Sequence, residues 1–169
     1  DHIDSDRRIY GSEYINSEIK NFNENFFIKK IGEDYLDCKI ECLMTLANCV
    51  KFKANNKGSG GGWHKDSIYK QYKSILYLND VTDLNGPFEL IKNSNKFWWS
   101  IFNISFLKKK IFETRFENKE IDYLIKYKDI KKITLLGKKG TLILVDTSMI
   151  HRGSPLREHE RYALTNYFY

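Results

Sequence analysis

GTLILVDTSMIHRGSP, residues 140–155, is the stretch that most restricts the fold. Its segment 141–146 is dominated by aliphatic residues and lies between a glycine and a polar turn, which predicts a strand. A histidine, His151, follows a few residues after this strand. The stretch therefore combines a buried strand with a side chain that can bind a metal or move a proton.

Further strands are predicted on both sides of this stretch. Alternation of apolar residues predicts one long strand, or two joined strands, over 38–53. Residues 74–79, 87–91 and 161–169 are also expected to be extended. Apolar residues at 15, 19, 22 and 26 predict one helix that begins near Ile15 and stops at Gly32. Residues 55–62, NNKGSGGG, are expected to form a flexible loop. Short strands with few helices favour an antiparallel barrel or jelly roll.

Length and composition bound the class of protein. The chain has 169 residues, of which 41% are hydrophobic and 30% are charged, so one globular domain is expected. No apolar run approaches the roughly 20 residues of a membrane helix. Three clustered cysteines do not make a disulfide framework, so reduced thiols and a cytoplasmic location are expected. The chain starts at Asp1 rather than Met, so we expect a processed or excised chain.

The net charge of +6 is concentrated in one region. Residues 100–133 contain nine Lys or Arg against five Asp or Glu. Such a lobe is usually a solvated face, but it can attract an anionic substrate or bind nucleic acid.

Two histidines and one aspartate form a candidate metal site. His64 and Asp66 are two positions apart, so on an extended chain both side chains point to the same side. A third ligand must come from elsewhere, and His151 is the candidate because an antiparallel barrel can bring it beside the pair. Two histidines and one carboxylate are the ligand set of non-haem Fe(II) oxygenases, and nitrogen and oxygen ligands suit that metal.

An arginine near the last predicted strand is the candidate anion clamp. Arg161 begins that strand, and a guanidinium matches a carboxylate in a bidentate manner. It would hold the far carboxylate of a dicarboxylic co-substrate chelated to the metal. Arg152 and Arg157 are nearer to His151 along the chain, but they lie in a loop and are expected to face solvent.

Four segments in order resemble the phytanoyl-CoA dioxygenase-like family of Fe(II)- and 2-oxoglutarate-dependent oxygenases. They are WHKD (63–66), SILYLNDVTDLNGPFELIKNSNK (74–96), the stretch 140–155, and an arginine before a terminal strand. The resemblance covers most of the chain from Ile15 onward. It implies a mainly β fold, the double-stranded β-helix (a cupin-like jelly roll) with flanking helices, in a single oxygenase domain over 1–169. Residues 97–132 would then be an insertion or lid between barrel strands.

The resemblance also implies a function. Fe(II) would be bound by His64, Asp66 and His151, and Arg161 would bind the co-substrate 2-oxoglutarate. With dioxygen, a small-molecule substrate would be hydroxylated, and succinate and carbon dioxide released. Related halogenases have a small residue in place of the aspartate, so Asp66 favours hydroxylation, or a desaturation or epoxidation variant.

Two further residues are candidates for the co-substrate site. Asn48 interrupts the apolar face of the 38–53 strand, and Tyr77 is the polar-tipped residue of the 74–79 strand. Either could instead satisfy backbone groups in the core.

The chain departs from the family in two places. Asn93, Ser94 and Asn95 replace a Gly-Ser-His turn, and Gly153 replaces a small hydroxyl residue two positions after the distal histidine. Ser154 is a candidate substitute for that hydroxyl.

Two rival functions are considered. A non-oxygenase cupin-like protein could use the same triad to bind another metal or a small ligand. A basic module could bind nucleic acid through residues 100–133, although no nucleic-acid motif is present.

Overall fold

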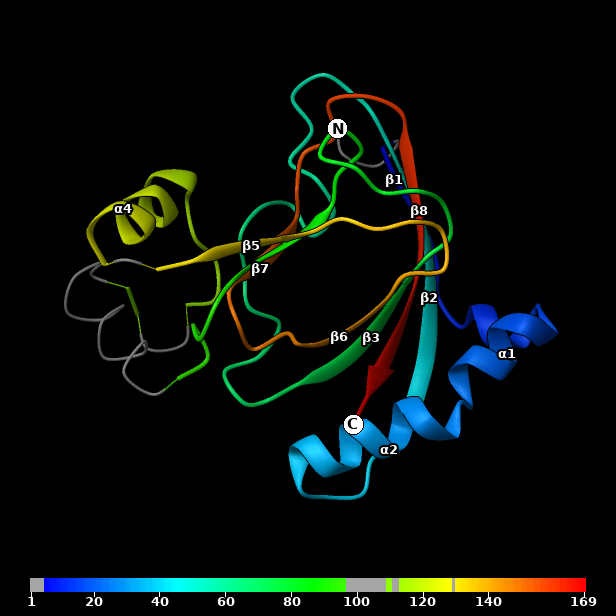
Figure 1. Cartoon of the computed structure of the whole chain (residues 1–169). Helices are drawn as coiled ribbons and strands as arrows, with labels where there is room; N and C mark the ends of the chain where they lie inside the picture. Colours follow the sequence, from blue (N-terminus) through cyan, green and yellow to red (C-terminus); the bar gives the residue numbers. More distant parts are fainter. Residues whose placement is uncertain (1–4, 97–108, 111–112, 129) are drawn as a thin grey trace.

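The computed structural model describes residues 5–96, 109–110, 113–128 and 130–169, which form two antiparallel sheets that face each other (Figure 1). The large sheet has the strand order β1-β2-β8-β3-β6 and the small sheet the order β5-β4-β7. Every paired neighbour is antiparallel. This arrangement confirms the predicted jelly-roll fold.

The large sheet contains the longest strands. Its members are β1 (Asp6–Ile9), β2 (Cys42–Lys51), β3 (Tyr72–Tyr77), β6 (Leu142–Asp146) and β8 (Glu160–Phe168). The small sheet contains β4 (Phe88–Ile91), β5 (Lys132–Leu135) and β7 (His151–Gly153). The strand predicted over 141–146 is β6, and the one predicted over 161–169 is β8.

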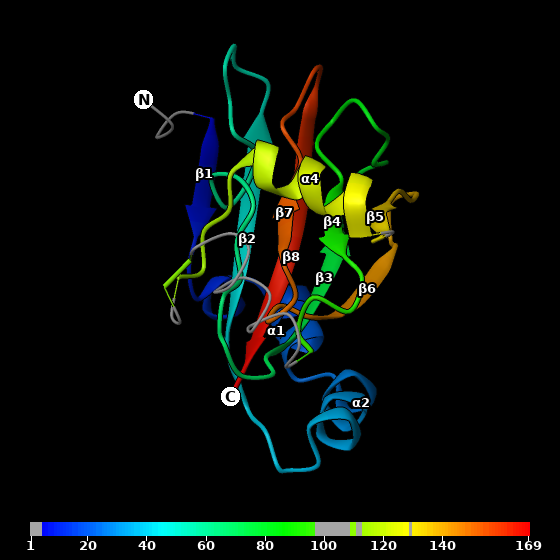
Figure 2. The same ribbon diagram turned by 90° about the vertical axis from the view of Figure 1, so that its left-hand side faces the viewer.

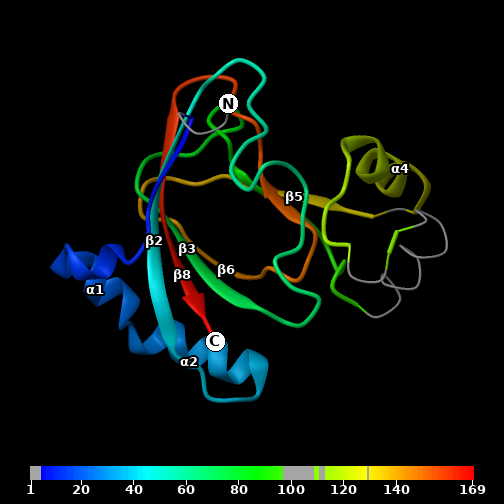
Figure 3. The ribbon, with the colours of Figure 1, turned by 180° about the vertical axis from the view of Figure 1, so that it is seen from behind.

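Helices lie on the outer sides of both sheets. The helices α1 (Ser17–Asn23) and α2 (Phe26–Leu36) lie beside the large sheet, after a short 3-10 turn at Ser12–Tyr14, whereas α4 (Asn118–Lys128) lies beyond the small sheet (Figures 1 and 3). In Figure 2, α4 is in front, the small sheet behind it and the large sheet farthest back. No helix in the described part of the chain is long and apolar enough to span a lipid bilayer.

Three apolar clusters hold these layers together. Ile75, Tyr77, Phe88 and Val145 belong to the cluster between the two sheets. Side chains from α4 and the small sheet form the second cluster, and the third lies between α2 and the end of the large sheet. The central cluster places the facing sides of both sheets around a common interior, and the candidate site lies in that interior.

The predicted single helix was wrong, because the chain forms two helices and Gly32 lies inside the second. A Cβ atom added at Gly32 would lie 2.5 Å from the ring of Tyr72 on β3. The glycine therefore lets α2 pack closely on the large sheet instead of ending the helix. The helix ends at Leu36, where Asp37 adopts a left-handed conformation with φ of 57°.

The first half of the chain differs from the prediction in two more ways. The strand predicted over 38–53 is shorter in the structure, where β2 runs over Cys42–Lys51. Cys38, before the strand, is exposed, and Phe52, after it, is 53% exposed, so neither belongs to the buried face. Residues 6–9, for which no strand was predicted, pair with β2 as the edge strand β1.

The segment 97–132 is described only in part. Its aromatic residues Phe97, Trp98, Trp99, Phe102 and Phe106 lie outside the described residues. In the part that is described, α4 packs on the small sheet, and Thr114 and Arg115 line the cavity between the sheets. The role of this segment as a lid stays a prediction.

Candidate metal centre

The two candidate histidines are held side by side by backbone hydrogen bonds. The His64 N–H donates to the His151 carbonyl at 2.9 Å, and the His151 N–H donates to the His64 carbonyl at 2.8 Å. Residues paired in this way lie directly opposite each other, with their side chains on the same face of the sheet. The imidazole ring centroids are accordingly 4.4 Å apart. The segment around His64 thus extends the small sheet beside β7.

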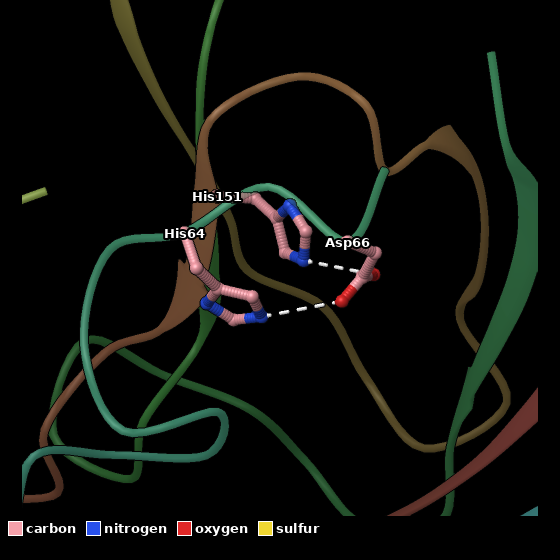
Figure 4. Close-up of side chains that lie close together, drawn as sticks. All are labelled: His64, Asp66 and His151. Atoms are coloured by element: carbon pink, nitrogen blue, oxygen red, sulfur yellow. Dashed lines mark ion pairs between the residues drawn. The ribbon is translucent and has the colours of Figure 1, made fainter. Parts of the chain in front are cut away.

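Asp66 completes the cluster from the same segment as His64. Its backbone N–H donates to the Thr147 carbonyl at 3.0 Å, which fixes the segment beside the end of β6. Its Oδ1 lies 3.4 Å from Nε2 of His64, and its Oδ2 lies 3.3 Å from Nε2 of His151 (Figure 4). One ligand atom from each residue lies within 4.8 Å of the others, a spacing that can hold a metal ion.

Hydrogen bonds at the far side of each ring set the tautomer. Nδ1 of His64 lies 2.8 Å from the Gly62 carbonyl, and Nδ1 of His151 lies 2.8 Å from the Met149 carbonyl. A carbonyl oxygen only accepts, so each Nδ1 must carry the hydrogen. In the neutral rings, both Nε2 atoms are then free to bind a metal. This is the usual outer support of metal-binding histidines.

The electrostatics of the cluster favour the metal-binding forms. Burial alone would raise the pKa of Asp66, but His151, His64 and Lys73 together hold it well below the usual range. Burial lowers the pKa of His151, which keeps its ring neutral at physiological pH. The site therefore offers an anionic oxygen ligand and a neutral nitrogen ligand from these two residues.

Lys73, which sequence reasoning missed, contacts the triad directly. Its Nζ donates to Oδ2 of Asp66 at 2.8 Å and lies 3.7 Å from the centroid of the Tyr167 ring. The residue is only 5% exposed. On β3, Lys73 lies two and four residues before Ile75 and Tyr77, so all three side chains point to the same face. The sequence could have predicted from this period of two that Lys73 points into the interior.

A cavity of about 400 Å³ connects the triad with the predicted anion clamp. Its lining includes the triad together with Asn48, Tyr77 and Arg161. Arg161 is 5% exposed, and its Nη1 donates to the Gly86 carbonyl. Its Nε has no hydrogen-bond partner among the described residues. A buried guanidinium with an unpaired donor is costly, so this end of the cavity lacks an acceptor.

The other two sequence candidates, Asn48 and Tyr77, both line this cavity. Asn48 faces the cavity, with Nδ2 donating to Oγ of Ser59 at 3.5 Å. The Tyr77 hydroxyl donates to the Leu135 carbonyl at 3.0 Å and accepts from the Phe88 N–H at 2.9 Å. Backbone groups thus use its only hydrogen. Contact of either residue with a co-substrate stays a prediction.

The two competing arginines do not face the cavity between the sheets. Arg152 was expected to point to solvent, but its Nε donates to Oε2 of Glu89 at 2.7 Å and its guanidinium lies 4.3 Å from the centroid of the Trp63 ring. Arg157 is exposed, as expected. Both line a second cavity, on the side of the small sheet that faces α4.

The unusual turn at 93–95 keeps a regular geometry. Asn93 adopts a left-handed conformation with φ of 62°, which glycine favours and asparagine tolerates. The side chain of Asn95 donates to Oδ2 of the buried Asp146 at 2.8 Å. The replacement of Gly-Ser-His is therefore accommodated without disturbing the triad.

Comparison with known proteins finds the fold but no family. No protein-family model matches the chain, and no curated protein matches it. Among solved structures, EctD from S. alaskensis with bound Fe has a TM-score of 0.71 at 15% identity, over 96% of this chain and 56% of that one. The nogalamycin-biosynthesis epimerase SnoN, in complex with Fe3+, alpha-ketoglutarate and nogalamycin RO, has a TM-score of 0.69 at 10% identity, over 97% and 63%.

A third structure gives the same result. AviO1 from Streptomyces viridochromogenes Tue57 has a TM-score of 0.65 at 11% identity, over 95% of this chain and 65% of that one. The chain therefore spans less than two thirds of each of these structures. At such low identity the likeness establishes the jelly-roll fold alone, so any argument about function must rest on the residues of the candidate site.

Proposed function

We propose that this chain is an Fe(II)- and 2-oxoglutarate-dependent dioxygenase of the phytanoyl-CoA dioxygenase-like family, which hydroxylates a small-molecule substrate. The main support is one cavity with two complementary ends. A His-Asp-His cluster lies at one end, and a buried arginine with an unpaired Nε lies at the other. The solved structures with Fe and 2-oxoglutarate bound have the same fold, which agrees with this proposal.

The donor set fits the proposed metal and co-substrate. Two imidazole nitrogens and one carboxylate suit Fe(II) and leave coordination positions for other ligands. Nε of Arg161 has no hydrogen-bond partner among the described residues, and 2-oxoglutarate has a second carboxylate to offer. When bound, Fe(II) and 2-oxoglutarate would supply the oxidation: substrate C–H, 2-oxoglutarate and dioxygen give substrate C–OH, succinate and carbon dioxide.

The residues of the chain position and shield these groups. His64, Asp66 and His151 would hold the metal, and the bonds from Nδ1 to carbonyls would keep both rings in place. Phe88 stacks on the His151 ring with centroids 5.3 Å apart, which excludes water from that side of the ring. Arg161 would orient 2-oxoglutarate through its far carboxylate, and Asn48 and Tyr77 line the same cavity.

The charge of the cavity supports an anionic substrate. Arg8, Lys73 and Arg115 also contribute to its lining, whereas Asp66 is its only acidic residue in the described part of the chain. Arg115 comes from the basic segment 100–133, which connects the charge seen in the sequence with the cavity. A positive cavity raises the local concentration of anions. The three free cysteines agree with a cytoplasmic location.

The test is release of succinate from 2-oxoglutarate with and without Fe(II), against a panel of anionic and neutral metabolites. We expect Fe(II)-dependent release that an anionic substrate stimulates and that Asp66→Ala abolishes. Asp34→Ala is a matched control, because Asp34 is exposed on α2 and pairs only with Lys30. An Asp66→Ala variant as active as the parent would refute the ligand assignment. Metal binding without any succinate release would favour the non-oxygenase cupin-like alternative.

A further inference from the structure

The side chain missing at Gly153 leaves a space that another residue occupies. Gly153 lies two residues after His151 on β7, so a side chain there would point into the cavity. A Cβ atom added at Gly153 would lie 2.9 Å from Cβ of Ser59 and 3.1 Å from both terminal nitrogens of Arg161. Ser59 therefore stands where a side chain at position 153 would be, next to the guanidinium. Ser154 instead lines the second cavity.

Glycines on both sides of Ser59 allow this close approach. A Cβ atom at Gly58 would lie 2.0 Å from the Gly153 carbonyl, and one at Gly60 would lie 2.3 Å from the His64 ring. Both glycines also adopt positive φ values, 74° and 84°. Only glycine satisfies both conditions without strain. The glycine-rich loop, residues 55–62, is thus pressed between β7 and the first metal ligand.

Hydrogen bonds hold the loop in this place. The Gly153 N–H donates to the Ser59 carbonyl at 3.1 Å. Asn56 accepts from the Leu156 N–H at 2.9 Å through Oδ1 and donates to the Leu156 carbonyl at 2.8 Å through Nδ2. The loop is therefore tied at two separate points, to the end of β7 and to the segment that follows it. Its position relative to Arg161 follows from these contacts.

The Ser59 side chain lines the cavity, and its hydroxyl donates to no acceptor among the described residues. Its Oγ accepts from Nδ2 of Asn48 at 3.5 Å, the long end of hydrogen-bond range, so its own hydrogen is left for another acceptor. No carboxylate of the described residues is hydrogen-bonded to Arg161 or Ser59. Asp66 is engaged by Lys73, and Asp6, whose charge acts on Arg161, pairs with Arg8. The unpaired Nε of Arg161 and the Ser59 hydroxyl hence lack an acceptor in the same region.

We propose that Ser59 donates a hydrogen bond to the far carboxylate of 2-oxoglutarate, beside Arg161, and so supplies from the glycine-rich loop the hydroxyl that position 153 lacks. This inference rests on the proposed function. A carboxylate can accept about four hydrogen bonds, so a bidentate guanidinium leaves room for one more donor. Asn48 is then a positioning residue that orients the hydroxyl.

The test is the dissociation constant of 2-oxoglutarate, measured by calorimetry on the Fe(II)-loaded protein without oxygen. We expect Ser59→Ala to weaken binding about 10-fold, the effect of one hydrogen bond to a charged group. The probe 2-oxobutyrate lacks the far carboxylate, so the parent and Ser59→Ala should bind it equally. Equal binding of 2-oxoglutarate by both proteins, or equal weakening of both ligands, overturns the proposal.

A reciprocal exchange separates the hydroxyl from the fold of the loop. Gly153→Ser alone should weaken binding, because its Cβ would meet Cβ of Ser59. Combining it with Ser59→Gly removes the collision and returns a hydroxyl to the corner, so the pair should bind more tightly than Ser59→Gly alone. A pair that binds no better than Ser59→Gly contradicts the proposal. If the parent itself binds no 2-oxoglutarate, the proposed function fails; if only the Ser59 effect is absent, this inference alone fails.

Discussion

The two ends of the cavity between the sheets differ in how far the protein satisfies them itself. At the metal end, Lys73 donates to Asp66, and Nδ1 of His64 and Nδ1 of His151 each donate to a backbone carbonyl. At the anion end, the buried Arg161 has an unpaired Nε. The donors of the first end are satisfied before any ligand arrives, whereas those of the second are satisfied only when an acceptor enters.

This difference reflects how each end is built. The metal end comes from two adjacent segments whose backbones bond to each other, so its geometry follows from sheet pairing. The anion end combines a residue of β8 with an inward residue of β2 and the glycine-rich loop soon after it, both of which are distant from β8 in the sequence. We therefore expect substitutions at the two ends to separate metal binding from co-substrate binding.

Removal of a ligand at the metal end should have the largest effect. In His151→Ala the site loses one of the three proposed protein ligands, so we expect Fe(II) affinity to fall at least about 100-fold, beyond the usual effect of an outer-shell change. Metal titration monitored by calorimetry measures this loss. His159→Ala is the control, since His159 is an exposed histidine outside both cavities. Unchanged Fe(II) affinity in His151→Ala would contradict the proposal that His151 is a metal ligand.

Removal of the charge at the anion end should follow in size. Arg161→Gln should weaken 2-oxoglutarate about 100-fold, because a bidentate charge-assisted contact is lost. Fe(II) affinity should change less than about threefold, since Arg161 does not contact the triad in the described structure. Arg157→Gln is the matched control outside the cavity. Parallel losses of both affinities would show that the two ends are not independent.

Substitution of Lys73 tests whether its hydrogen bond to Asp66 strengthens Fe(II) binding or competes with the metal for the carboxylate. In Lys73→Met, Asp66 loses the donor that holds its Oδ2. We expect about 10-fold weaker Fe(II) binding, the usual cost of losing an outer partner of a metal ligand. Lys73→Arg should retain part of the affinity. Tighter Fe(II) binding by Lys73→Met would instead mean that the lysine occupies the carboxylate at the expense of the metal.

Tyr77 should give the smallest effect on ligands, because its hydroxyl already has two backbone partners. Tyr77→Phe leaves the partly buried Leu135 carbonyl and the buried Phe88 N–H without that partner, so we expect a loss of about 1–3 kcal/mol in the free energy of unfolding. The affinity for 2-oxoglutarate should change less than about threefold. Chemical denaturation and calorimetry measure the two quantities. A large loss of affinity at unchanged stability would give Tyr77 a direct contact with the co-substrate.

The sequence predicted the residues whose positions follow from local periodicity. His64 and Asp66 share a side because they are two apart on an extended segment, and Arg161 begins a recognisable strand. Lys73 was accessible by the same argument, since it alternates with Ile75. Gly32 was wrongly predicted to end the helix, because the sequence does not show that this position packs against the Tyr72 ring. The place of Ser59 depends on positive φ angles and on contacts with β7, which no periodicity encodes.

The central claim is that one cavity holds Fe(II) and 2-oxoglutarate together. Anaerobic addition of 2-oxoglutarate to the Fe(II)-loaded protein, followed by visible absorption, tests it most directly. The account predicts a weak charge-transfer band that saturates at one equivalent of co-substrate and is absent in Asp66→Ala. A parent protein that binds Fe(II) and yet shows no band with 2-oxoglutarate would contradict it.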